Sequence, residues 1–496
     1  MKILFVASEV TPFAKSGGLA DVTGALPKSL KKQGHDVRII LPFYSEVERG
    51  GYGIRKGRKS VDVMIGGSVK RGLFRHTNLE DIPVYLLENK EYFSRDHLYG
   101  SASGEYPDNH LRFAFFCRGV LDLLKKMDYR PDIIHCHDWQ TAMIPLILKK
   151  EKGDDLFFSK TGTVFTIHNL AYQGLFPKEA MADMGLDPSL FTIDCLEYYG
   201  KVNLIKGAIL TADVINTVSE TYCREILTPE SGDGLDGVLT LRKNDLYGVL
   251  NGIDYEHWNP ATDRGISKNF TPGAPAGKAA NKKALQKRLG LEIAEDIPLI
   301  GMVSRLTEQK GLDLLEALLP RIAKAKLQLV LLGTGDEKYL KLLQEFAALG
   351  TDNVSVNIGF HPELAPQIYA GSDIFLMPSR YEPCGLGQMI ALRYGAVPVV
   401  RKTGGLADTI FDERDQSKEP NGFSFDEYTP EALWEALSRA VEAYSDKLAW
   451  KKMMKRGMAG DFSWNTSALK YEELYRLVLA KKGGSRWQKK KTFWKN

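Results

Sequence analysis

Short runs rich in β-branched residues alternate with helical stretches along almost the whole chain, and this alternation limits the possible folds more than any other feature. In the first half, the runs predict strands at residues 2–7, 36–41, 132–135 and 163–167, with a helix at 24–34 between the first two. In the second half, they predict strands at residues 299–303, 327–332, 354–358, 374–377 and 397–400. Continuous apolar runs between helices are typical of parallel sheets covered on both faces. The pattern therefore predicts an α/β protein in which each half forms a Rossmann-like, doubly wound parallel sheet.

A chain of 496 residues is too long for one ordinary hydrophobic core, so we expect more than one domain. The predicted boundary lies within residues 247–254, ahead of a stretch rich in Pro, Gly, Ser and Thr (260–277) that suits a surface connection. The predicted domains are therefore 1–247 and 248–460. A helix at 461–480 is expected to pack back on the first domain.

The net charge of +4 comes from a basic tail at residues 481–496, which holds seven Lys and Arg and no acid. Without these seven cations the net charge becomes −3. A nucleic-acid-binding protein is expected to spread basic residues over a folded face, so no nucleic-acid partner is predicted. No apolar run approaches the ~18 residues of a membrane helix. Residues 1–7 are interpreted as a buried first strand and not as a signal peptide.

The five cysteines are widely spaced and include no Cys-x-x-Cys pair. Neither a disulfide framework nor a cysteine zinc site is indicated. A reducing cytoplasm is the natural interpretation.

The sequence Gly-Gly-Leu-Ala-Asp occurs twice, at residues 17–21 and 404–408, each time after a predicted strand and ahead of a predicted helix. Glycines let the backbone approach a ligand closely, and a helix N-terminus favours anions. Lys15 adds a cation to the first copy. Taken alone, each copy is also compatible with a plain strand-to-helix turn.

Charged residues follow two strands of the second half. Arg305 and Lys310 come after the strand at 299–303, and two cations beside a helix N-terminus suit a diphosphate. Glu382 comes after the strand at 374–377, where it could accept hydrogen bonds from sugar hydroxyls or stabilise positive charge. The alternatives are solvent-exposed cations and an acidic turn residue beside a buried Cys384.

Histidines stand at the ends of two strands in the first half, at positions 135, 137 and 168. A zinc site is possible from the residue types, but the His-x-His spacing is weak without further ligands. We favour hydrogen bonding to a sugar. The chain has no P-loop, and it has no Asp-x-Asp pair of the kind that bridges a diphosphate through a metal. Arg305, Lys310 and backbone amides are therefore expected to neutralise a leaving diphosphate.

Six segments taken together resemble bacterial glycogen synthases and plant starch synthases, which share the two-domain glycosyltransferase fold called GT-B. The segments are Lys15-Ser-Gly-Gly-Leu19, His135-Cys-His-Asp-Trp139, Val249-Leu-Asn-Gly-Ile-Asp254, Ser304-Arg-Leu306 with Gln309-Lys-Gly-Leu312, Glu382-Pro-Cys-Gly-Leu386 and Thr403-Gly-Gly-Leu-Ala-Asp408. The resemblance covers nearly the whole chain. The resemblance implies transfer of glucose from ADP-glucose to the non-reducing end of an α-1,4-glucan, with retention of configuration and with no metal or cofactor.

The resemblance also implies roles for single residues. The catalytic group would be Glu382, His168, Arg305, Lys310 and Asp138. The donor-binding group would be Lys15, Gly17, Gly18, Phe360, Cys384, Gly385, Leu386, Thr403 and Gly404, with the Phe360 ring against the adenine. The sugar or acceptor contacts would be Asp21, His135 and Asn169. The first domain would form the acceptor side and the second would bind the nucleotide sugar, as opposite walls of one donor site.

Several alternatives stay open at this point. A related transferase could use UDP-glucose or a small acceptor, and position 360 offers no hydroxyl with which to select a base. A phosphorylase with pyridoxal phosphate has a related fold, although such chains are usually longer. A glucan-binding protein without catalysis is a further possibility. The single firmly placed carboxylate favours same-face attack over double displacement.

Overall fold

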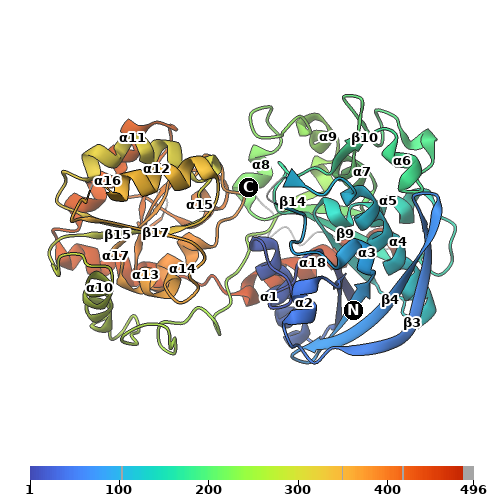
Figure 1. Cartoon of the computed structure of the whole chain (residues 1–496), viewed down its shortest axis with the longest axis horizontal. Helices are drawn as coiled ribbons and strands as arrows, with labels where there is room; N and C mark the ends of the chain where they lie inside the picture. The colour runs from blue at the N-terminus through green and yellow to red at the C-terminus, as the bar shows by residue number, and fades with distance from the viewer. Residues whose placement is uncertain (102–103, 349, 416–417, 484–496) are drawn as a thin grey trace. The chain divides into compact units, whose positions relative to one another are not determined.

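The computed structural model describes residues 1–101, 104–348, 350–415 and 418–483, and the chain folds into two compact units (Figure 1). Unit 1 comprises Met1–Gly252 together with the chain from Trp464 onward, and unit 2 comprises Ile253–Ser463. The division falls after Gly252 and not after Tyr247 because Val249 is fully buried in the core of unit 1.

Unit 1 has most of its strands in one large mixed sheet and the others in two small sheets. Its strands are β1 (Lys2–Val6), β2 (Asp36–Pro42), β3 (Arg55–Ile65), β4 (Ser68–Leu79), β5 (Ile82–Glu88), β6 (Gly100–Ser101), β7 (Gly104–Glu105), β8 (Ile133–His137), β9 (Gly162–Ile167), β10 (Leu175–Pro177), β11 (Glu197–Tyr198), β12 (Lys201–Asn203), β13 (Val214–Thr217) and β14 (Leu246–Gly248). Its helices are α1 (Gly18–Lys32), α2 (Ser45–Arg49), α3 (Lys90–Phe93), α4 (Asn109–Met127), α5 (Met143–Lys150), α6 (Ala180–Asp183), α7 (Leu204–Thr211), α8 (Glu220–Glu225), α9 (Asp236–Leu241) and α18 (Trp464–Gly483).

The main sheet of unit 1 has the order β14-β13-β9-β8-β1-β2-β5-β4-β3. All pairs from β14 to β5 are parallel, whereas β4 pairs antiparallel with both β5 and β3. The antiparallel edge corrects the prediction of a purely parallel sheet. The alternating exposed and buried residues at the end of β3 fit an edge strand with one solvated face.

Helix α18 completes the core of unit 1, beside α1 and β9 (Figure 1). Its buried face includes Tyr471, Leu474, Tyr475 and Val478. The helix runs to Gly483, so Lys481 and Lys482 belong to it and not to a tail. They form ion pairs with Asp245 and Asp213, respectively. The rest of the predicted tail, 484–496, lies outside the described residues.

Unit 2 contains one parallel sheet with helices on its faces. Its strands are β15 (Leu299–Val303), β16 (Gln328–Gly333), β17 (Val354–Ile358), β18 (Ile374–Met377), β19 (Val397–Arg401) and β20 (Phe423–Phe425). Its helices are α10 (Gly277–Arg288), α11 (Leu312–Ile322), α12 (Glu337–Ala348), α13 (Ala365–Gly371), α14 (Gly387–Arg393), α15 (Gly404–Thr409), α16 (Pro430–Ala443) and α17 (Lys447–Ala459).

The sheet of unit 2 has the order β17-β16-β15-β18-β19-β20, in which every neighbouring pair is parallel. Counted from its first strand, this is the 3-2-1-4-5-6 order of the dinucleotide-binding fold. The parallel part of unit 1 has the same order, because β5-β2-β1-β8-β9-β13 are its third, second, first, fourth, fifth and sixth parallel strands. Ligands bind such sheets beyond the carboxyl ends of the strands where the order reverses, which is at β1/β8 in unit 1 and at β15/β18 in unit 2.

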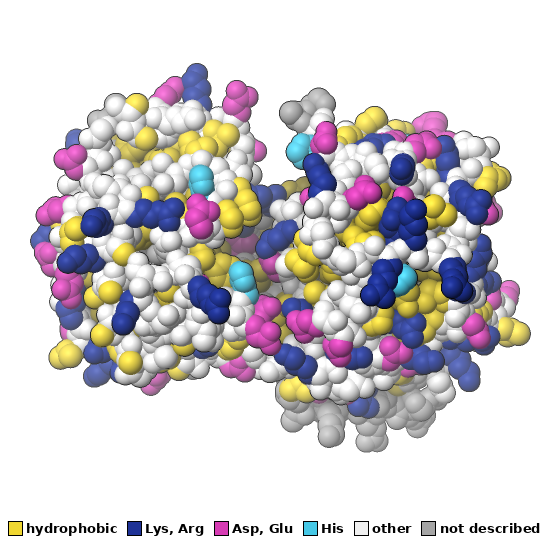
Figure 2. Space-filling view, turned by 60° about the horizontal axis from the view of Figure 1, so that its bottom comes forward, with side chains coloured by type: hydrophobic (Ala, Val, Ile, Leu, Met, Phe, Trp, Pro, Cys, Tyr) yellow, Lys and Arg dark blue, Asp and Glu magenta, His cyan; other side chains and the backbone are white. Residues whose placement is uncertain are grey.

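The charges on the face shown in Figure 2 do not single out a partner. On the face shown in Figure 2, Lys and Arg side chains are interspersed with Asp and Glu on both units. Among the described residues, no helix is both long enough and apolar enough to cross a bilayer. None of the five cysteines, all within the described ranges, is in a disulfide.

Candidate active site

The loop after β1 is held by a buried carboxylate that the sequence did not single out. Glu9 accepts hydrogen bonds from the backbone N–H of Ser16 and of Gly17, at 3.1 Å for Gly17, and from the Ser16 hydroxyl at 2.6 Å. The Tyr99 hydroxyl donates to the same carboxylate at 2.7 Å. These contacts fix the start of α1. Glu9 lies in irregular chain and Tyr99 is ninety residues away, so no local pattern could have paired them.

Lys15 and Gly17 lie in this loop, and Gly18 is the first residue of α1. The Lys15 Nζ donates to Asp21 Oδ1 at 2.6 Å, and the lysine side chain is half exposed. A Cβ built on Gly17 or Gly18 would meet no other atom of the described chain within 4 Å. Packing therefore does not require glycine at either position, and both peptides are open to close approach by a ligand.

The end of β8 carries Asp138 in a strained backbone conformation, with φ 54° and ψ −177°. Its Oδ1 accepts the backbone N–H of His168 at 2.7 Å, so it joins the ends of β8 and β9. Burial raises the pKa of the Asp138 carboxyl to about 7, although the His168 N–H opposes this shift. Strain of this kind is stored at functional sites when the surrounding structure holds it in place.

His168 is partly buried, and burial lowers its pKa to about 3, so the ring is neutral at physiological pH. Its Nε2 lies 3.0 Å from Nδ1 of His137, a fully buried residue of β8 that the sequence named only as a possible zinc ligand. The neighbouring Asn169 is partly exposed, and its Oδ1 accepts the Ala171 N–H.

His135 does not fit the expected sugar contact. It is fully buried, with Nδ1 2.9 Å from the Tyr475 hydroxyl and Nε2 2.6 Å from the Thr166 hydroxyl. Both ring nitrogens are therefore occupied within the core, and the residue ties β8 to α18. The depth at which a strand residue is buried depends on what packs over the sheet, which a His-x-His pattern alone does not reveal.

In unit 2, the residues after β15 and β18 meet through an ion pair. Lys310 Nζ lies 2.8 Å and 2.6 Å from the two carboxylate oxygens of Glu382, and the Ser379 hydroxyl donates to Glu382 Oε2 at 2.9 Å. Arg305 is exposed, and its guanidinium makes no hydrogen bond or ion pair within the described part of the chain. The strand order reverses between β15 and β18, so an exposed cation and a paired cation stand where a ligand is expected.

The second Gly-Gly loop supports the segment that carries Glu382. The Gly405 N–H donates to the Glu382 carbonyl at 3.1 Å. A Cβ on Gly404, where φ is 45°, would overlap that same carbonyl oxygen, and a Cβ on Gly405 would overlap the Cys384 carbonyl oxygen. The two Gly-Gly copies thus differ, since in this one packing of backbone against backbone requires glycine.

The remaining predicted donor contacts of unit 2 come after β17, β18 and β19. Cys384 and Thr403 are buried, Gly385 has a φ of 73°, and Leu386 precedes α14. Phe360 follows β17 and is 84% exposed. A large apolar ring left in solvent beyond the carboxyl end of a strand is available to stack on a base.

The structure offers no cluster of metal ligands among the described residues. Nowhere in them do three or more His, Cys, Asp or Glu side chains converge in a way that could hold an ion. The direct contact between His137 and His168 uses one nitrogen of each ring for the other ring, which is unlike a shared zinc site.

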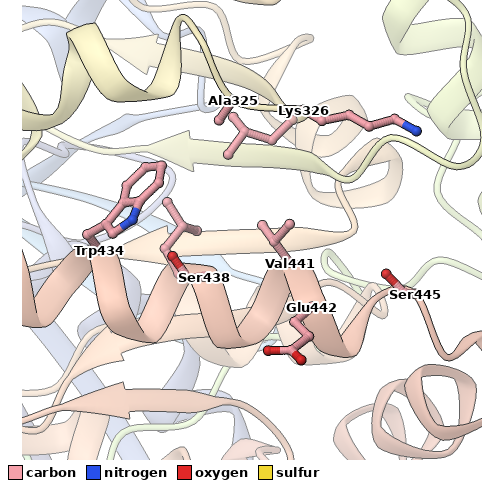
Figure 3. A pocket seen from close by; sticks show the side chains of 9 residues that line it. Ala325, Lys326, Trp434, Ser438, Val441, Glu442 and Ser445 are labelled. Atoms are coloured by element: carbon pink, nitrogen blue, oxygen red, sulfur yellow. The ribbon is translucent and has the colours of Figure 1, made fainter.

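A groove in unit 2 lies away from all these residues (Figure 3). It is lined by residues 325–327 and by Trp434, Leu437, Ser438, Val441, Glu442 and Ser445. Residues 325–327 come directly before β16, so the groove is at the amino end of that strand. The predicted site residues follow the carboxyl ends, where the chemistry of such sheets is found.

Comparisons with known proteins agree with this geometry. The family described as starch synthase catalytic domain matches residues 2–241, and glycosyl transferases group 1 matches residues 285–456. The glycogen synthase of Geotalea daltonii is 99% identical over 483 residues, which are 97% of this chain and 100% of that protein. The glycogen synthase of Thermotoga maritima is 48% identical over 97% of this chain and 100% of its own.

Solved structures give the same result. The catalytic domain of starch synthase IV from Arabidopsis thaliana, bound to ADP and acarbose, has a TM-score of 0.88 and 36% identity. The comparison covers 97% of this chain and 99% of that one. A sucrose-phosphate synthase from Thermosynechococcus elongatus, at 17% identity and a TM-score of 0.61, shares the fold.

Two Rossmann-like units with reactive groups at the ends of their parallel strands define a glycosyltransferase of the GT-B class. Within that class, the chain belongs to the family of bacterial glycogen synthases and plant starch synthases. It is a hexosyltransferase with glycogen synthase activity.

Proposed function

We propose that this chain transfers glucose from ADP-glucose to the non-reducing end of an α-1,4-glucan, with retention of configuration and without a metal or other cofactor. The ADP in the Arabidopsis starch synthase structure supports an ADP-sugar donor, and the acarbose in it supports a glucan acceptor. The exposed Phe360 ring supports stacking on the adenine. A cytoplasmic location accords with five cysteines that form no disulfide.

The Lys310–Glu382 ion pair, together with the exposed Arg305 after β15, carries the proposal. A diphosphate bears more charge than one carboxylate, so it competes with Glu382 for the Lys310 ammonium, and the exposed Arg305 adds a second cation. Both cations stay on the leaving ADP as its charge increases in the transition state. This arrangement supplies the positive charge that a divalent ion provides in metal-dependent transferases.

Glu382 has two roles in this scheme. While no donor is bound it neutralises Lys310, and once the diphosphate takes that ammonium its carboxylate can stabilise positive charge on the transferred sugar. Ser379 still donates a hydrogen bond to Glu382 Oε2 after Lys310 has moved to the diphosphate, which reduces the power of the carboxylate as a nucleophile. This supports attack on the same face by the acceptor hydroxyl, with the departing phosphate taking its proton, over a covalent glucosyl intermediate.

In unit 1, we assign Lys15, Gly17 and Gly18 to the donor, and Asp138 and His168 to the glucose. Glu9 and Tyr99 hold the loop that presents the first group. Asp138 holds the peptide of His168, so the second group is preorganised before substrate arrives.

Loss of either cation tests this function. Lys310→Met and Arg305→Met should each reduce kcat/KM for ADP-glucose about a hundredfold or more, because a charge-assisted contact to the transition state is worth about 3 kcal/mol. Lys341→Met is a matched control, since Lys341 is exposed on α12 and pairs with Glu345 of the same helix. Equal activity of the three variants in a glucan-extension assay would refute the assignment.

A further inference from the structure

A chain of buried imidazoles leads from the core of unit 1 to His168. His137 is 0% exposed, and its ring stacks on Phe5 at 5.5 Å between centroids and lies 4.1 Å from the ring of His135. Its Nδ1 faces His168 Nε2 at 3.0 Å. Its other nitrogen, Nε2, is buried and has no hydrogen-bond partner in the described part of the chain.

Only one proton can lie between the two rings. Burial lowers the pKa of His137 well below its ordinary value and that of His168 to about 3, so both rings are neutral. A neutral imidazole carries one N–H and one bare nitrogen. Either His137 donates from Nδ1 to His168 Nε2, or His168 donates from Nε2 to His137 Nδ1.

The unpartnered nitrogen distinguishes these arrangements. If His168 donates, the proton of His137 must sit on Nε2, where a buried N–H would have no acceptor within the described residues. If His137 donates from Nδ1, its Nε2 is a bare lone pair. Orphaned buried donors are rarer in proteins than under-satisfied acceptors, so the second arrangement is favoured.

We propose that His137 is a positioning residue that donates its Nδ1–H to His168 Nε2 and thereby fixes the proton of His168 on Nδ1. His168 then presents a hydrogen-bond donor, and not a base, to a bound sugar. Asp138 holds the His168 peptide through Oδ1, so backbone and ring are both oriented from the end of β8. The hydrogen bond that one nitrogen of an imidazole makes determines which of the two nitrogens carries the proton.

In the neighbouring His135, the hydrogen bonds place the ring proton on Nε2 and leave Nδ1 bare. Thr166 donates its hydroxyl proton to Asn216 Oδ1 at 2.7 Å, so its oxygen must accept from His135 Nε2–H. His135 Nδ1 is then bare and accepts from the Tyr475 hydroxyl. His135 and His137 therefore carry their protons on opposite nitrogens, which gives the experiment an internal reference.

The inference narrows the chemistry available to His168. With Nε2 occupied by His137 and Nδ1 protonated, the ring cannot take a proton from the acceptor hydroxyl. This part rests on the proposed function, in which the departing phosphate takes that proton. The tautomer itself is a property of the ligand-free chain, so measuring it tests this inference independently of any transfer assay.

Long-range ¹H–¹⁵N correlation spectra of protein labelled with ¹⁵N-histidine test the proposal, since protonated and bare ring nitrogens have distinct ¹⁵N shifts. His168→Gln and His137→Gln assign the two rings. We expect His168 and His137 both protonated on Nδ1, and His135 protonated on Nε2. A spectrum of the unaltered protein with His168 protonated on Nε2 would overturn the proposal.

The role of His137 is tested by a matched pair of substitutions. His137→Leu removes the donor, whereas His137→Gln can still direct an amide N–H to His168 Nε2. We expect the His168 ring to lose its single Nδ1-protonated signal in the leucine variant and to keep it in the glutamine variant, with kcat falling at least about tenfold more in the former. An unchanged His168 signal in the leucine variant would show that His137 does not set the tautomer.

Discussion

At the scale of single residues, two glutamates hold the two loops to which we assign the donor contacts. Glu9 binds the amides of Ser16 and Gly17 through its carboxylate, and Glu382 accepts from Gly405 through its carbonyl. The Glu382 carboxylate also forms an ion pair with Lys310. The first glutamate is therefore a fixed support, whereas the second can exchange its partner when an anion arrives.

This exchange predicts an unusual result for Glu382→Gln. The substitution removes the anion that competes with ADP for Lys310, so ADP should bind about fivefold more tightly, equivalent to about 1 kcal/mol, while glucan extension is lost. Titration calorimetry with ADP measures the affinity. Ser379→Ala is the control, because it removes a hydrogen bond to Glu382 but keeps the charge. Weaker ADP binding by the glutamine variant would contradict the exchange.

Asp138 predicts a dependence of stability on pH. Its pKa is about 7 in the folded chain and ~3.9 when unfolded. The folded state therefore binds more protons between these values, and the contribution of Asp138 to the free energy of unfolding falls as pH rises from about 4 to about 7. The Asp138→Asn side chain does not ionise, so this variant does not lose that contribution to stability as the pH rises.

Relative to the unaltered protein, the asparagine variant should gain up to about 4 kcal/mol on going from about pH 4 to about pH 8, at about 1.36 kcal/mol per pKa unit. Urea unfolding at the two pH values measures the difference. A stability difference that is the same at both would show that the carboxyl is not perturbed. Asp21→Asn, at an exposed ion pair, serves as the comparison.

At the scale of elements, the parallel strands are what the sequence predicted best. The strands at 299–303 and 374–377 have the predicted bounds, because strands covered on both faces are continuous apolar runs. The strand at 354–358 also has the predicted bounds, although it is a partly buried edge strand. The antiparallel strands β3 and β4 were missed because their polar, alternating residues lack that signal. The parallel strands β5, β13, β14 and β20 were not predicted either. Helix α1 begins at Gly18, ahead of the predicted start at Gly24, since the glycines of the loop conceal its first turn.

The candidate site was predictable only in part for a related physical reason. Residues that follow strands, such as Asp138, Arg305 and Glu382, could be found from their position in the motif. Contacts that join distant segments, such as Glu9 with Tyr99 or His137 with His168, depend on which strands are neighbours. Strand order is set by packing of the whole sheet, which no short window of sequence contains.

The docking of α18 against β9 gives a prediction at this scale. A Cβ on Gly162 would overlap the Val478 side chain, so Gly162→Ala should destabilise unit 1 by about 1–3 kcal/mol. Val478→Ala alone should cost a similar amount through lost packing. Together they should cost less than the sum of the two, because the second removes the clash of the first. Thermal unfolding of the three variants measures the coupling, and strict additivity would count against contact between the two residues.

At the scale of the whole molecule, the two units repeat one plan with different chemistry. The parallel strands of each have the 3-2-1-4-5-6 order, and the polar groups follow the first, fourth and fifth of them in unit 1 and the first and fourth in unit 2. Unit 1 supplies groups of perturbed pKa, Asp138 and His168, whereas unit 2 supplies the Lys310 and Arg305 cations. This division matches a transferase in which one substrate is a glucan and the other is a nucleoside diphosphate sugar.

The most direct test of the proposed function is the rate of glucan extension from ADP-glucose and from UDP-glucose, each measured with glycogen in the presence of excess EDTA. We expect transfer from ADP-glucose at an undiminished rate and at least about tenfold slower transfer from UDP-glucose. Loss of transfer on chelation, with recovery on adding a divalent ion, would contradict the metal-free mechanism. Equal or faster use of UDP-glucose would contradict the proposed donor.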